Sequence, residues 1–132
     1  MVDNHTRFTL PEGSQVRSGA PTILPVKLLF SLGVLFEELG CVSEAYVAFV
    51  QFTGPDSSTE PPHLALEIRM REDTPMQYSE LLLKMGETIK KSYPNPEQPI
   101  DVLEIGGKST LKGPFSGAQL FYKSVDGKAV PM

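Results

Sequence analysis

The run AYVAFVQF at residues 45–52 constrains the fold most strongly, because it is apolar on both sides of an extended strand. Successive side chains of a strand point to opposite faces of a sheet. Both sets are apolar here: Tyr46, Ala48, Val50 and Phe52 on one face, and Ala45, Val47 and Phe49 on the other. A two-layer fold needs only one apolar face. We therefore expect a second cover, either the C-terminal run PFSGAQLFYK of the same chain, or a partner or second copy.

The first half of the chain reads as strand, helix, strand. Residues 14–19 form a short strand candidate, and apolar residues then recur at helical spacing over residues 25–39. Those facing inward in this helix are Leu28, Leu29, Leu32, Leu35, Phe36 and Leu39. Pro25 suits the first helical position, and Gly40 suits the left-handed residue that ends a helix. The next strand is expected at residues 43–53.

The second half repeats the pattern as strand, helix, strand. After the loop TGPDSSTEPP, Leu64, Leu66, Ile68 and Met70 alternate with polar or small residues, which is typical of a strand with one buried face. Thr74, Pro75 and Gln77 predict a capping-box start for a second helix that stops before Pro94. A fourth strand is expected at residues 99–105.

This order predicts an α+β fold of the ferredoxin-like kind, βαββαβ. We expect a two-layer sandwich, an antiparallel sheet with two helices on one face, followed by an extra C-terminal segment. At 132 residues the chain fits a single domain, residues 1–132.

Charge and composition argue against several classes of partner. Twelve basic against sixteen acidic side chains give a net charge of −4, which offers no general attraction to nucleic acid or to anionic membranes. The longest apolar run is too short to span a bilayer and the polar start is no signal peptide, so we expect a cytoplasmic protein. Cys41 is the only cysteine, and no metal site or cofactor is predicted.

The Gly-Lys-Ser at residues 107–109 resembles the end of a phosphate-binding loop, but the rest of that motif is missing. The position that needs the first glycine is Val102, inside the predicted fourth strand. Cys41 and His63 are the residues that a nucleophile and a base would need, yet nothing in their spacing brings them together. No catalytic residues are predicted, and we expect a protein that is not an enzyme.

The stretches LPEGSQVRSGAP, PPHLALEI and GPFSGAQLFYK, together with the proline-started helix, resemble the C-terminal domain of the bacterial enhanced serine sensitivity (SseB) protein family. The resemblance covers residues 10–123, leaving 1–9 and 124–132 as flexible termini. Members of that family carry a separate N-terminal domain, and their central loop is shorter than TGPDSSTEPP. The resemblance implies a link to amino-acid metabolism and supplies no active-site residues.

Two functions follow as hypotheses. The first is a non-enzymatic protein-interaction domain that binds an unknown protein or forms a homodimer. Its predicted binding residues are Arg17, His63, Glu67 and Arg69 on the second sheet face, with Phe121 and Tyr122 as anchors. The alternative is a regulatory domain that binds an amino acid such as serine, with the turn SGAPT at residues 18–22 as its binding point.

Overall fold

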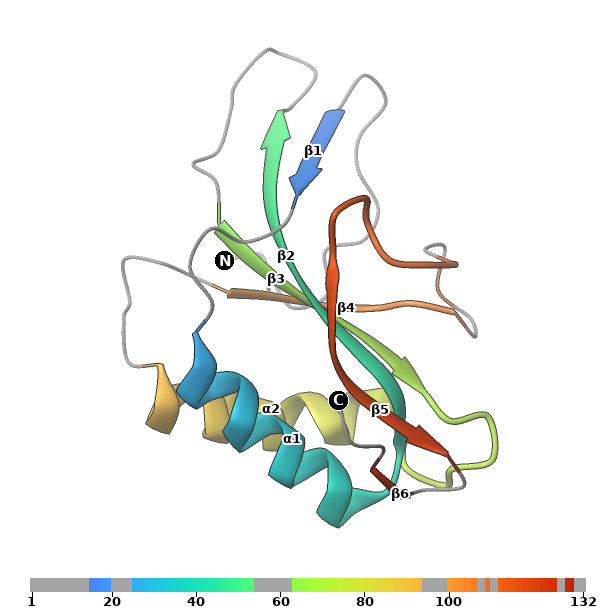
Figure 1. The fold of residues 1–132 in the computed structure, drawn as a ribbon. Helices are drawn as coiled ribbons and strands as arrows, with labels where there is room; N and C mark the ends of the chain where they lie inside the picture. The colour runs from blue at the N-terminus through green and yellow to red at the C-terminus, as the bar shows by residue number, and fades with distance from the viewer. Residues whose placement is uncertain are drawn as a thin grey trace.

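Helices and strands follow one another in the predicted order, with further strands after the fourth (Figure 1). The computed structural model describes residues 15–19, 25–53, 63–93, 100–106, 109, 112–125 and 128–129. The elements are β1 (Gln15–Gly19), α1 (Val26–Leu39), β2 (Val42–Thr53), β3 (His63–Met70), α2 (Tyr78–Ser92), β4 (Ile100–Glu104), β5 (Gln119–Val125) and β6 (Lys128–Ala129).

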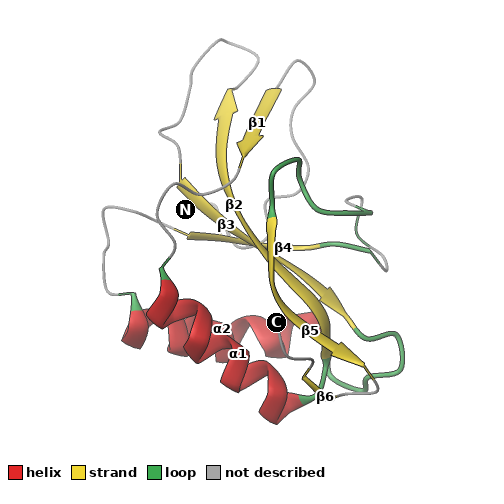
Figure 2. Ribbon diagram, viewed as in Figure 1, coloured by secondary structure: helices red, strands yellow, loops and turns green. Residues whose placement is uncertain are grey.

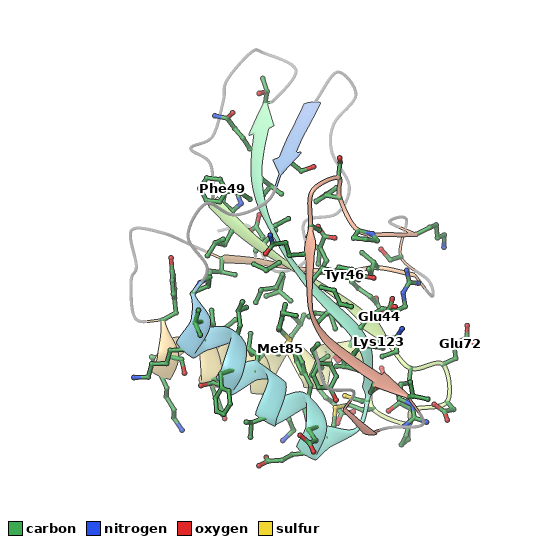
Figure 3. The ribbon with its side chains drawn as sticks, viewed as in Figure 1. Glu44, Tyr46, Phe49, Glu72, Met85 and Lys123 are labelled. Carbon is green, nitrogen blue, oxygen red and sulfur yellow. The ribbon has the colours of Figure 1, made fainter. Side chains whose placement is uncertain are left out.

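Both helices lie on the same face of the sheet, which confirms the α+β class (Figure 2). The inward stripe of α1 is the predicted one, because Leu28, Leu32 and Phe36 are fully buried. They form a core with the helix-facing side chains of the sheet and with Leu81 and Met85 of α2. Met85 lies between α2 and the sheet in Figure 3.

The sheet is mixed rather than antiparallel as predicted. Its order is β4-β3-β2-β5-β6, with β1 also paired to β2, and β3 and β4 run parallel because α2 carries the chain back to the end from which β3 starts. In a split βαβ unit the strands joined by a helix run parallel with another strand between them. Here β1 and β2 are antiparallel neighbours, so the strand order differs from the predicted ferredoxin-like one.

The doubly apolar strand β2 is the centre of this sheet. One edge of β2 pairs with β3, and the other edge is divided between two strands. β1 pairs with residues 49–53, and β5 pairs with residues 44–47 through a bulge at Ala45/Tyr46. The C-terminal segment that contains Phe121 and Tyr122 is therefore partly a sheet strand, which the sequence did not predict.

The helix ends match the predictions in part. Gly40 ends α1 with φ 66°, the left-handed conformation predicted for it, but Pro25 is the residue before the helix and not its first residue. The capping box does not form at Thr74, whose hydroxyl accepts the Met76 N–H at 3.2 Å, and α2 begins only after Gln77. Pro94 lies outside the described residues.

Candidate functional site

The second face of the sheet is covered by the chain itself. Ala48 and Val50 of β2, Ala65 of β3 and Leu103 of β4 form a small buried cluster on the side opposite the helices. Residues 112–118, here called the covering segment, place Phe115 and Ala118 against that cluster. The sequence left two possible covers for the apolar strand, the run PFSGAQLFYK or a partner or second copy. In the structure, the start of the run PFSGAQLFYK supplies cover for this cluster.

Glu67 is a deeply buried acidic side chain beneath this cover. It lies opposite Tyr46 in the β2–β3 register and is 1% exposed. One carboxylate oxygen accepts the Phe115 N–H at 2.9 Å. Burial raises the Glu67 pKa to about 7, and the bond from Phe115 offsets part of that rise. Glu67 therefore acts within the chain, as an anchor for the covering segment.

Arg69, two residues further along β3, anchors the other end of the same segment. Its Nε donates to Glu44 Oε1 at 3.0 Å, and its Nη2 donates to the Lys112 carbonyl at 3.1 Å. Figure 3 shows Glu44 beside Tyr46 on β2. The guanidinium also lies against Gly106, where a Cβ would come within 2.5 Å of Nη1. Arg69 joins β2, the turn after β4 and the covering segment.

His63 contacts Asp101 at the opposite end of β3. The His63 Nε2 and Asp101 Oδ2 atoms are 2.7 Å apart, and both side chains are buried. His63 pairs with Val50 near the end of β2, whereas Cys41 precedes the start of β2 and contacts Met76 through sulfur. Cys41 and His63 therefore lie at opposite ends of the β2–β3 pair and form no nucleophile–base arrangement.

The remaining predicted binding residues are Arg17 in β1 and the two aromatic residues of β5. Arg17 lies in β1 opposite Gln51, and its side chain is outside what the structure describes. Phe121 and Tyr122 pack on Phe36 with ring-centroid distances of 6.3 and 5.3 Å, and Tyr122 is 5% exposed. Because Tyr122 is a core side chain, the prediction that it anchors a partner is corrected.

An exposed apolar surface occurs instead on the outside of α1. Its exposed residues are Val26, Lys27, Phe30, Val34, Glu37 and Glu38, here called the α1 outer face. Val26, Phe30 and Val34 follow one another at four-residue spacing and so share one side of the helix. The Phe30 side chain is 73% exposed. The sequence contained evidence of this surface. An amphipathic helix has one apolar side, whereas α1 has apolar residues on its outward side as well as on its inward side.

A groove runs beside this face between the two helices. Its volume is about 330 Å³, and it is lined by Phe30, Ser31, Val34 and Leu35 on α1 and by Thr88 on α2, among others. The Ser92 hydroxyl donates to the Ser31 hydroxyl at 3.2 Å and holds α1 and α2 together within the groove. The α1 outer face thus combines a protruding aromatic ring with an adjacent hollow.

A second, more polar pocket of about 1010 Å³ lies beyond the end of β3. Arg71 and Glu104 line it, together with the residues that lead into α2. The Arg71 guanidinium already donates to the Gly40 carbonyl and to Asp73 Oδ2. Burial raises the pKa of Glu104. This pocket offers charges of both signs, but both of its arginines, Arg69 and Arg71, already have partners within the chain.

Three further observations concern a phosphate-binding loop, a metal site and a membrane-spanning helix. Val102 lies within β4 and is buried, which confirms that the phosphate-loop pattern is interrupted by a strand. No group of three or more potential metal ligands occurs among the residues with described side chains. Neither described helix is long and apolar enough to cross a membrane.

Comparisons of the chain with family models, with curated proteins and with solved structures find no match. The resemblance to the SseB C-terminal domain therefore remains a prediction.

Proposed function

We propose that the chain is a cytoplasmic, non-enzymatic protein-interaction domain that binds its partner through the α1 outer face. The observation that carries this proposal is the row Val26, Phe30 and Val34, exposed beside a groove. Contiguous exposed apolar side chains with a polar rim are typical of protein interfaces. Lys27 and Glu37 supply such a rim at the two ends of the helix.

Phe30 is the expected centre of the interface. Removing apolar surface from water contributes roughly 25 cal/mol per Å², and buried aromatic side chains commonly dominate binding energy. The sheet face on which the sequence placed the predicted binding residues packs against the covering segment, and the Tyr122 ring packs against Phe36. The inward residues of α1 fill the core, so the residues of the α1 outer face are the ones left exposed for a partner.

The test compares two equally exposed apolar side chains. Phe30→Glu places a charge in the proposed interface, and Leu83→Glu does the same on α2, where Leu83 is 74% exposed and outside the groove lining. Tagged variants are used to recover bound proteins from cells of origin, and thermal unfolding checks that both variants fold. We expect bound protein to be lost with Phe30→Glu and kept with Leu83→Glu. Equal retention by both variants would reject the α1 outer face.

The amino-acid-binding alternative is supported by the polar pocket. An amino acid carries a carboxylate and an ammonium group, and Arg71 and Glu104 provide charges of both signs there. The turn predicted earlier for this role, SGAPT, lies mostly outside the described residues. Isothermal titration with serine should give saturable heat that Glu104→Gln weakens. Absence of heat at millimolar serine would remove this alternative.

A further inference from the structure

We propose that the partner is a second copy of this chain, with the two α1 helices packed antiparallel through their outer faces. This inference rests on the proposed function, since it names the protein that the α1 outer face binds. A two-fold interface brings the same surface of both copies together, so that surface must complement itself. Three properties of α1 satisfy this requirement.

The first property is the distribution of charge. The charged residues of α1 are Lys27 near its start and Glu37 and Glu38 near its end, and all three are exposed. Antiparallel packing places Lys27 of each copy beside the two glutamates of the other. Parallel packing would place like charges together, which is unfavourable across an interface. The charge pattern therefore favours one orientation.

The second property is that these charges oppose the helix's own dipole. The start of a helix is electropositive and its end electronegative, so acidic residues stabilise the start and basic residues the end. α1 has no acidic residue in its first turn and no basic residue in its last turn. α2 has the favourable arrangement, with Glu80 first and Lys90 and Lys91 last. An antiparallel copy brings to each end of α1 the charge that this end lacks.

The third property is the spacing of the apolar residues. An antiparallel pair centred near Leu32 sets Phe30 opposite Val34 of the second copy, and Lys27 opposite Glu37. The groove beside Phe30 and Val34 gives the second phenyl ring a hollow to enter. The same register therefore brings apolar residues against apolar residues and each lysine against a glutamate.

The experiment is a charge exchange followed by sedimentation equilibrium of the purified full chain at low ionic strength. One variant is Lys27→Glu, and the other is the pair Glu37→Lys with Glu38→Lys. Each alone faces like charges in the antiparallel pair, so we expect self-association at least about tenfold weaker than in the unchanged chain. Mixed together they face opposite charges again, and we expect a one-to-one complex. The triple variant should regain self-association.

Folding does not confound this result. Each variant improves the match between charge and helix dipole, so the monomer should be at least as stable while its self-association weakens. Lys84→Glu, an exposed lysine on α2, is the matched control and should leave the mass at twice the 14.5 kDa chain. A monomeric unchanged chain at micromolar concentrations, or a mixture that does not associate, would overturn the proposal.

The outcomes for self-pairing and for the proposed function are distinguishable. If Phe30→Glu releases a different protein while the unchanged chain is monomeric, the interaction function stands and self-pairing fails. If the chain is monomeric and Phe30→Glu releases nothing, both fail.

Discussion

Glu67 is a carboxylic acid in the interior, and its ionisation opposes folding. Its pKa is about 7 in the folded chain against an ordinary value of 4.5, because burial disfavours the charged form. Between these values the folded state holds a proton that the unfolded state has lost. The free energy of unfolding should therefore fall as pH rises from 4.5 towards 7, by on the order of 3 kcal/mol.

Glu67→Gln tests this directly. The amide oxygen still accepts the Phe115 N–H, and no buried charge forms at high pH. Urea unfolding should show the variant more stable than the unchanged chain at pH 8 and about equally stable at pH 4.5. Glu72→Gln, at an exposed position, is the control and should leave the pH dependence intact. Identical pH profiles for Glu67→Gln and the unchanged chain would contradict the account of this residue.

Gly106 combines a left-handed backbone with a close side chain. Its φ is 75°, and a Cβ would meet the Arg69 guanidinium at 2.5 Å. Gly106→Ala should destabilise the chain by about 1–2 kcal/mol, mainly through the backbone, since the guanidinium can move. Gly113→Ala is the matched control, because nothing lies within 4 Å of its Cβ position and its φ is not positive. Chemical unfolding that ranks the two variants equally would reject this explanation.

At the scale of elements, the charged residues of α1 oppose its helix dipole, whereas those at the ends of α2 match its dipole. Lys27→Glu should raise the free energy of unfolding of the monomer by about 0.3–1 kcal/mol, because it puts a negative charge in the first turn of α1. Glu80→Lys, in the first turn of α2, should lower it by a similar amount. Thermal unfolding at concentrations where the chain is monomeric measures both. Changes of the same sign would contradict the dipole argument.

The covering segment should also contribute measurably to stability. Phe115 packs on the small apolar cluster and is partly buried, so Phe115→Ala should cost about 2 kcal/mol, less than a fully buried phenylalanine. Ser116→Ala, whose side chain is exposed, is the neighbouring control and should change little. If Phe115→Ala left urea unfolding unchanged, the segment would not close the second sheet face.

Local patterns predicted the elements better than their pairing. Alternation identified the core side of β3, where Leu64, Leu66 and Ile68 are buried as expected. Alternation could not show that β3 is buried on its other side as well, because Glu67 reads as a solvated residue until the covering segment is placed over it. Strand order and the role of β5 depend on contacts between residues far apart in the chain, which local periodicity does not encode.

The site was the harder part to predict. His63, Glu67 and Arg69 do share one face of β3, but each has a partner within the chain: Asp101, the Phe115 N–H and Glu44. Polar residues on a strand have no local pattern that distinguishes a binding surface from an internal network. The sequence alone therefore could not decide whether this face is open or paired within the chain. On α1 the inward leucines were recognised, and the exposed row containing Phe30 was a signal present in the same segment.

At the scale of the whole molecule, the architecture determines which apolar surface remains available. Both helices lie on one face of the sheet (Figure 2), and Phe115 and Ala118 of the covering segment pack on the small apolar cluster of the other face. Three of the five large apolar side chains that are exposed in the described part of the chain belong to α1. The outside of the helical layer is consequently the surface from which we expect the chain to bind protein.

The most direct measurement places a photo-cross-linking amino acid at position 30 or at position 83 of the chain in its own cells. Both side chains are almost equally exposed, so exposure alone predicts equal cross-linking. We predict a specific cross-linked protein from position 30, which is a second copy of the chain if α1 pairs with itself, and none from position 83. Equal cross-linking from both positions, or none from position 30, would contradict the claim that the α1 outer face is an interaction surface.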